Sequence, residues 1–173
     1  LSSLSAILQL AAHWKDEAPL RNALTTLPDE LSTAWQADWS PLTDGLVDAH
    51  NLFVLGRGLG LAAAQEAALK FKETCGLHAE AYSSAEVKHG PMALVGPGFP
   101  VLGFTQPDET GAGTLALASE FRARGAQVWV SSAQGDLPLA QAPHPACAPL
   151  LTIQSFYRAI NALALRRGHN PDV

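Results

Sequence analysis

The stretch that decides the fold runs from Asn51 to Pro91 and reads N-L-F-V-L-G-R-G-L-G-L-A-A-A-Q-E-A-A-L-K-F-K-E-T-C-G-L-H-A-E-A-Y-S-S-A-E-V-K-H-G-P. Its opening run, 51–55, is short, apolar and β-prone, which predicts a buried strand. A glycine-rich turn over 56–60 follows, then a helical pattern, and then a loop over 78–91 that ends in His-Gly-Pro. Open α/β sheets bind ligands at the edge where such a strand ends. The sequence therefore directs attention to the turn and to the elements after it.

Strands and helices alternate on either side of this stretch. Residues 100–104 and 126–130 have the composition of two further buried strands. We expect helices over 41–48, 114–124 and 151–167, while 146–150 could add an edge strand. Alternating strands and helices favour parallel pairing with right-handed crossovers. The predicted fold class is α/β, a three-layer α/β/α sandwich with a mainly parallel sheet.

Residues 1–39 form a predicted helical lead-in without a strand signal, and residues 40–173 form the predicted domain. One helical stripe in the lead-in consists of Leu20, Leu24, Leu27, Leu31 and Trp35. Pro28 has no backbone N–H, so we expect it to start a new helical turn or to kink the helix. We interpret the lead-in as a packing helix or a connector.

Composition limits the class of protein. The 173 residues are 47% hydrophobic and 16% charged, which is typical of a globular chain. The net charge of −5 argues against a nucleic-acid surface, because binding the phosphate backbone needs clustered basic side chains. Apolar runs are too short for a membrane span, and no signal peptide pattern opens the sequence, so we expect a cytoplasmic location. Cys75 and Cys147 lack metal-ligand spacing, which predicts free thiols and no metal site.

The glycine-rich turn only partly fits a dinucleotide-binding motif. Leu61 stands where the third glycine of G-x-G-x-x-G belongs, and no acidic residue closes a following strand at the usual distance. We therefore predict neither a nicotinamide nor a flavin, nor any other cofactor. The backbone amides at Gly56 and Gly58 could still hold an anion or a sugar hydroxyl, with Arg57 nearby.

The helix after the turn has one charged face. At about 100° per residue, Glu66, Lys70 and Glu73 line up beside small alanines. The opposite face is apolar and carries Leu61, Ala64, Ala68, Phe71 and Cys75. A solvated Glu–Lys–Glu ladder, contributing roughly 0.2–0.5 kcal/mol per pair, explains the spacing without any function. The alternative is catalytic, because a tuned carboxylate beside a lysine can abstract a proton next to a carbonyl.

The loop over 78–91 carries further polar groups, of which His89 is the most distinctive. Gly90 and Pro91 make its backbone rigid, and Pro91 can open a short helix. A histidine in such a place can move a proton near neutral pH, although a surface histidine without function fits the same residues. We assign no role to His13, His50, His144 or His169.

Taken together, G-R-G, E-A-A-L-K-F-K-E and H-A-E-A-Y-S-S-A-E-V-K-H-G-P-M-A-L resemble a known family. They look like the second sugar isomerase (SIS) domain in the isomerase module of glucosamine-6-phosphate synthase. They are equally similar to relatives that lack the glutaminase domain, are built from two SIS domains, and act as aminosugar-phosphate isomerases or deaminases. The similarity covers roughly residues 39–172, and the lead-in resembles the linker between the two domains.

The resemblance implies a role for each matched residue. Glu73 would be the base that shuttles a proton between C1 and C2 of a hexose 6-phosphate. Lys70 and Glu66 would support it through charge and contacts to sugar hydroxyls. His89 would assist ring opening from a neighbouring subunit, which implies a homodimer.

Two departures from the family pattern limit these expectations. The family's phosphate loop is rich in Ser and Thr, whereas the matching turn here, 105–111, holds Pro107 and two acids and is a poor phosphate cradle. The family's C-terminal lysine would lie beyond residue 173, and the phosphate subsite would lie in a companion SIS domain. The hypotheses are therefore half of a composite catalytic site, or a non-catalytic domain that senses phosphosugars or mediates association.

Overall fold

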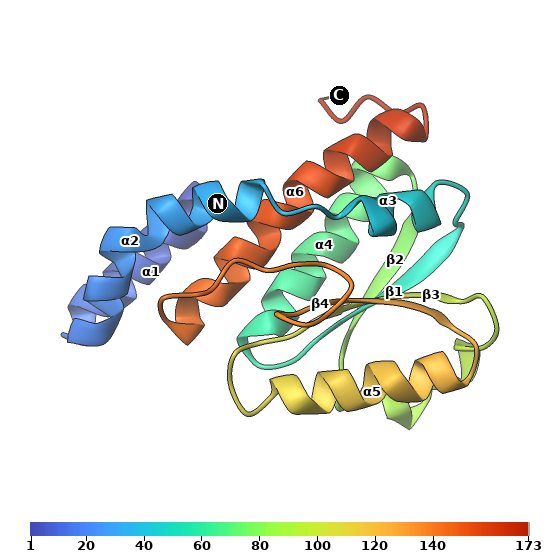
Figure 1. The fold of residues 1–173 in the computed structure, drawn as a ribbon, viewed down its shortest axis with the longest axis horizontal. Helices are drawn as coiled ribbons and strands as arrows, with labels where there is room; N and C mark the ends of the chain where they lie inside the picture. Colours follow the sequence, from blue (N-terminus) through green and yellow to red (C-terminus); the bar gives the residue numbers. More distant parts are fainter. Residues whose placement is uncertain (173) are drawn as a thin grey trace.

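The computed structural model describes residues 1–172 and places one parallel sheet between layers of helices (Figure 1). The helices are α1 (Ser2–Trp14), α2 (Ala18–Trp35), α3 (Ser40–Leu46), α4 (Leu59–Cys75), α5 (Gly111–Ala123) and α6 (Ala148–Arg166). The strands are β1 (Asn51–Gly56), β2 (His78–Ser83), β3 (Pro100–Phe104) and β4 (Gln127–Ser131). Short 3-10 helices are η1 (Val87–His89), η2 (Pro91–Leu94) and η3 (Pro145–Cys147). Within residues 1–172, no helix is both long and apolar enough to cross a membrane.

The strand order, β2-β1-β3-β4, explains which helix covers which face of the sheet. All three pairings are parallel. Connections between parallel strands are right-handed. When the chain changes the direction in which it adds strands across the sheet, the next connection therefore lies on the opposite face. The chain goes from β1 to β2 through α4, then turns back past β1 to β3, and continues to β4 through α5. α4 and α6 therefore cover one face and α5 the other (Figure 1), which confirms the predicted α/β sandwich.

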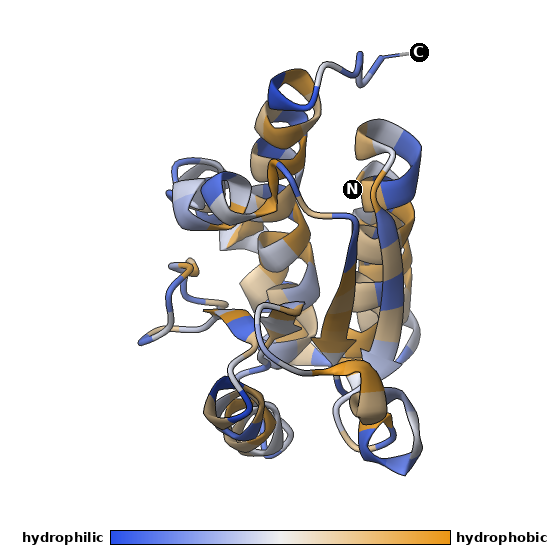
Figure 2. Ribbon diagram, turned by 90° about the vertical axis from the view of Figure 1, so that its right-hand side faces the viewer, coloured by the Kyte–Doolittle hydropathy of each residue, from blue (hydrophilic) through white to orange (hydrophobic). Residues whose placement is uncertain are grey.

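Each face of the sheet has its own apolar core. Along β1, Leu52 and Val54 pack on the α4 side, whereas Phe53 and Leu55 pack on the α5 side. Figure 2 shows apolar stretches in the sheet and mixed polar and apolar surfaces on the surrounding helices. Strands buried on both faces are typical of parallel sheets flanked by helices.

The lead-in is helical, as predicted, and packs against α6. Leu20 and Leu27 are buried in an apolar cluster shared with α6. Trp35, expected on the same stripe, is 42% exposed, and the buried residue at this end of α2 is Ala34. The division of the chain into 1–39 and 40–173 stays a prediction.

Of the two expectations for Pro28, the start of a new helical turn is wrong, whereas a kink at this residue stays a prediction. α2 continues through Pro28 from Ala18 to Trp35. Pro28 is exposed, so the carbonyl that loses its amide partner there can be hydrated, and the helix tolerates the loss.

Two other segments differ from the prediction. Residues 78–83 are not loop but form β2, which pairs with β1 along its whole length. Exposed His78, buried Ala79 and exposed Glu80 follow the period of an edge strand, but alanine and glutamate are poor strand formers and disguise it. The expected strand over 146–150 is also wrong, because α6 begins at Ala148 and Pro149 suits its first turn.

Arg167, just after α6, joins three elements at the amino-terminal edge of the sheet. Its guanidinium donates to the carbonyl oxygens of Cys75 at 2.9 Å, Leu46 at 3.0 Å, Val47 at 2.7 Å and Ala49 at 2.9 Å. These carbonyls lie at the ends of α3 and α4 and in the connection to β1, where helix geometry leaves acceptors without partners. One side chain therefore satisfies four backbone acceptors.

Candidate functional site

The glycine-rich turn brings the chain from β1 into α4 with very little space. Gly58 has a φ of 55°, a left-handed value that favours glycine. A Cβ on Gly56 would lie 2.3 Å from the Gly60 carbonyl oxygen, and one on Gly60 would lie 3.0 Å from Cγ of Gln106. Close packing therefore requires glycine at positions 56 and 60, whereas the backbone conformation favours it at position 58.

The neighbouring turn between β3 and α5 is occupied by one of its own acids. The Asp108 carboxylate accepts hydrogen bonds from the Thr110 amide at 2.8 Å and from the Thr110 hydroxyl at 2.5 Å. Arg57 lies across the first turn of α5, with its Nη1 3.4 Å from the position of a Cβ on Gly113. An anion at this turn would meet a carboxylate, which agrees with the expectation of a poor phosphate cradle.

The predicted charged face of α4 is present, and we call Glu66, Lys70 and Glu73 the polar face. Lys70 Nζ donates to Glu73 Oε2 at 2.7 Å, and the Glu73 side chain is 49% exposed. This hydrogen bond is the main cause that raises the pKa of Lys70 above its ordinary value. Lys70 is therefore an ammonium at neutral pH and lies within reach of a carboxylate that is open to a ligand.

Glu66 has a partner that the sequence did not reveal. The Tyr157 hydroxyl of α6 donates to Glu66 Oε1 at 2.7 Å. Burial, and then the Glu66 carboxylate, raise the pKa of Tyr157 far above its usual value, so its phenol stays protonated. Tyr157 follows Ile153 and Phe156 at helical spacing, which by sequence alone favours a place among the buried residues of α6. The sequence did offer one indication of this contact, because the hydroxyl of a largely buried tyrosine usually donates to a nearby acceptor.

A cavity of about 620 Å³ lies between α1, α4 and α6 beside this pair. Its walls are mostly apolar and include Leu4, Leu59 and Leu69. Glu66 and Tyr157 line it together, so one end of the polar face opens onto the cavity. Concave apolar sites with a few convergent polar groups are typical of ligand-binding or domain-packing surfaces.

His89 lies on the other side of the sheet. Val87 of η1 is buried in the α5-side core, and Lys88 forms an ion pair with Glu120 of α5. His89 itself is exposed. A single chain therefore does not bring His89 beside Glu73, which packs with α4 on the opposite face.

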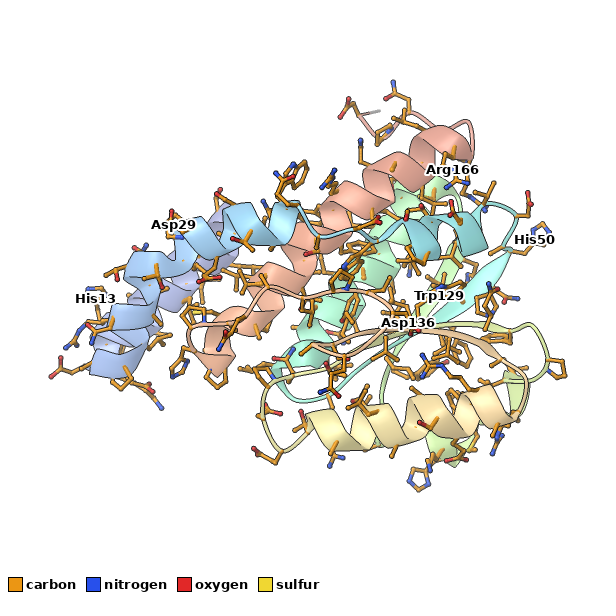
Figure 3. The ribbon with its side chains drawn as sticks, in the orientation of Figure 1. His13, Asp29, His50, Trp129, Asp136 and Arg166 are labelled. Carbon is orange, nitrogen blue, oxygen red and sulfur yellow. The ribbon has the colours of Figure 1, made fainter. Side chains whose placement is uncertain are left out.

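The other histidines are dispersed. His13 and His50 lie at opposite ends of the molecule (Figure 3) and are both exposed. His144 Nδ1 accepts a hydrogen bond from the Ala146 amide at the start of η3, which is a structural role.

Comparison with known proteins gives consistent matches. Residues 45–165 match the SIS domain family. Glutamine–fructose-6-phosphate aminotransferase (isomerizing) of Pyrobaculum aerophilum is 40% identical over 139 residues, which cover 76% of this chain and 23% of that protein. The crystal structure of a candidate phosphosugar isomerase from Silicibacter pomeroyi is 44% identical with a TM-score of 0.90, over 97% of this chain and 53% of that chain. The C-terminal domain of glucosamine-fructose-6-phosphate aminotransferase from Francisella tularensis is 28% identical with a TM-score of 0.71, over 94% of this chain and 48% of that chain.

The matched region includes β1, α4 and the loop that carries His89. The chain spans about a quarter of the length of the Pyrobaculum protein and about half of the two solved chains. It belongs to the SIS domain family and is related to the isomerase domain of glutamine–fructose-6-phosphate aminotransferases and to phosphosugar isomerases.

Proposed function

We propose that this chain is the C-terminal SIS domain of an enzyme that moves a proton between C1 and C2 of a hexose or hexosamine 6-phosphate. The enzyme is a sugar-phosphate isomerase, an aminosugar-phosphate deaminase or an aminotransferase-related protein. The substrate class rests on the names of the relatives and on the motifs shared with the family. The observation that carries the proposal is the partly exposed Lys70–Glu73 ion pair, with Glu66 one turn away in the wall of a cavity.

Each residue of the polar face has one task in this reaction. Glu73 removes a proton from the carbon next to the carbonyl of the open-chain sugar and returns it to the neighbouring carbon. Negative charge then develops on a sugar oxygen, and the ammonium of Lys70, which is hydrogen-bonded to Glu73, stabilises that charge. Glu66 accepts a hydrogen bond from a sugar hydroxyl. Moving the proton between two carbons of the same sugar is redox-neutral and needs no external oxidant, so the proposal includes no cofactor.

Ring opening is assigned to His89 of a second copy of the chain. His89 is exposed on the α5 side of the sheet, away from the polar face of its own chain. A homodimer can supply it to the neighbouring site, because a two-fold interface presents the same surface of both copies. The proposed working state is therefore a homodimer.

A companion SIS domain is proposed to cover the apolar part of the cavity and to bind the sugar phosphate. Leu4, Ile7, Leu59 and Leu69 are exposed around this cavity and form an apolar surface that a companion domain could cover. The Silicibacter relative, which matches 97% of this chain, is almost twice as long. The Asp108-filled turn leaves the phosphate to another subsite.

Proton exchange in the full-length protein that carries this chain tests the proposal. Fructose 6-phosphate and glucosamine 6-phosphate are incubated in D2O, and NMR follows deuterium at C1 of the first sugar and at C2 of the second. Glu73→Gln preserves the size of the side chain but removes the base, so exchange should fall by roughly 10²–10⁴-fold. Glu80→Gln, at an exposed carboxylate on β2, is the control and should exchange at the unmodified rate. Normal exchange in Glu73→Gln refutes the assignment.

A non-catalytic domain that senses phosphosugars or mediates association is the second candidate. The occupied β3–α5 turn favours it, because this half of the site offers no phosphate cradle of its own. Calorimetric binding of either sugar phosphate by the full-length protein, without turnover or exchange at C1 or C2, would decide for this candidate.

A further inference from the structure

Tyr157 reaches the polar face of α4 from a helix that lies far away in the sequence. Its hydroxyl donates to Glu66 Oε1 at 2.7 Å across 91 residues. We propose that Tyr157 is a positioning residue for Glu66: it holds Oε1, so that Oε2 is presented to a hydroxyl group of the bound sugar phosphate. The inference rests on the proposed function and deepens it by assigning a residue that the reaction as described leaves unused.

The surroundings of Glu66 make this contact important. Among the cavity-lining residues that the structure describes, only Gln65, Glu66 and Tyr157 have polar side chains. A carboxylate that faces apolar walls needs donors to compensate for lost hydration. Tyr157 supplies one donor to Oε1, whereas a carboxylate offers about four acceptor sites in total. Glu66 can therefore still accept a hydrogen bond from a hydroxyl group of a ligand.

Packing restrains the tyrosine that makes the contact. Its ring lies 6.3 Å from that of Phe156, which packs edge-on against Phe71 of α4 at 5.2 Å. The raised pKa of Tyr157 keeps the phenol protonated through neutral pH, so it is a donor whenever the site works. A restrained, permanent donor fixes the direction of the carboxylate before the sugar arrives, which reduces the ordering needed on binding.

The chain contains a second pair of the same kind that serves as a control. The Tyr82 hydroxyl donates to Glu80 Oε2 at 2.6 Å, but both residues lie on the edge strand β2 and Glu80 is exposed. Neither residue lines the cavity beside Glu66. Tyr82→Phe and Tyr157→Phe each remove one hydroxyl from a Tyr–Glu hydrogen bond, and only the second should affect the reaction.

The test is a double-mutant cycle in the full-length protein, with kcat and KM measured for fructose 6-phosphate and glucosamine 6-phosphate. Tyr157→Phe should lower kcat/KM by about tenfold, the usual consequence of losing one hydrogen bond to a charged group. In a Glu66→Gln background, Tyr157→Phe should cause no further loss, because the oriented carboxylate is already absent. Tyr82→Phe should match the unmodified protein. Melting temperatures of all variants report whether each one folds.

Three outcomes overturn the positioning role. These are unchanged kinetics in Tyr157→Phe, a loss from Tyr157→Phe that is equal in both backgrounds, and an equal loss from Tyr82→Phe. If the unmodified protein neither converts nor binds either sugar phosphate, the proposed function fails and the positioning role fails with it.

A spectroscopic measurement tests the contact separately from activity. The chain has two tyrosines, so in a Tyr82→Phe variant of the 173-residue chain the phenolate absorbance near 295 nm reports Tyr157 alone. Its midpoint should lie above the usual tyrosine value of about 10 and should fall when Glu66 is replaced by Gln. A midpoint that does not respond to Glu66→Gln shows that the bond is absent in solution and overturns the inference, whatever the kinetics of the longer protein.

Discussion

The two faces of the sheet differ in what they expose. On the α4 side, the polar face and Tyr157 meet at a cavity of about 620 Å³ with exposed leucines around it. On the α5 side, the loop that carries His89 is anchored by buried Val87 and by the Lys88–Glu120 ion pair. One face has a cavity lined by the Tyr157–Glu66 pair, and the other presents the exposed side chain of His89. The polar face of α4 and the loop that carries His89 are close in sequence but lie on opposite faces of the sheet.

The difference follows from the order of the strands. Only about a dozen residues separate Glu73 from η1, but β2 lies between them and the direction of travel across the sheet reverses after it. Right-handed crossovers then require opposite faces for α4 and for the segment after β2. Any dimer that uses both motifs in one site must combine the α4 face of one copy with the η1 loop of the other.

Subunit complementation is the strongest test of this comparison. Glu73→Gln and His89→Asn should each abolish most activity of the full-length protein. When the two variants are co-expressed with different tags, about a quarter of the unmodified activity should return, because random pairing makes half of the dimers mixed and each mixed dimer has one intact site of two.

Complementation fails if both residues act within one chain. Every site of a mixed dimer would then carry one damaged residue, and activity would stay at the level of the single variants. That result would refute the inference that Glu73 and His89 belong to one site only when two copies of the chain combine.

Two leucines provide a smaller test of which face is covered. Leu69 of α4 and Leu115 of α5 are each 43% exposed in this chain. Leu69→Glu should lower the unfolding free energy of the full-length protein by about 2 kcal/mol, as expected for placing a charge where a leucine is buried by the companion domain. The same change should have little effect on the 173-residue chain alone, and Leu115→Glu should have little effect in either.

Chemical denaturation of both variants, in the full-length protein and in the 173-residue chain, shows which face the companion domain covers. A large loss for Leu115→Glu and none for Leu69→Glu would mean that the α5 side is the covered one.

Lys88 should give the smallest effect. Lys88→Met removes an exposed ion pair and should change the melting temperature by less than about 2 °C at neutral pH. The Lys88 hydrogen bond lowers the pKa of Glu120, so its stabilisation is present above the usual glutamate value of about 4.3 and is lost as the pH falls below it. Melting curves of both proteins should therefore converge in acid. A difference that grows in acid would contradict this account.

Local patterns in the sequence predicted β1, the faces of α4 and the last helix, because each depends on residues within a few turns of one another. The polar face formed as expected since Glu66, Lys70 and Glu73 recur at helical spacing. The position of His89 could not be predicted in this way, because it depends on the strand order. The Tyr157–Glu66 bond depends on how α4 and α6 pack, which no local spacing encodes. β2 was missed because Ala79 and Glu80 are weak strand formers in an edge position.

The four carbonyl contacts of Arg167 have a consequence for the order in which the protein folds. They join the end of α6 to backbone that was synthesised about 90 to 120 residues earlier. Until the ribosome has released α6, the α4 side of the core lacks Phe156, Ile160 and Leu163, and its apolar face stays open. The domain should therefore complete its fold only after α6 has left the ribosome, and nascent chains stopped before α6 should be the ones that recruit chaperones.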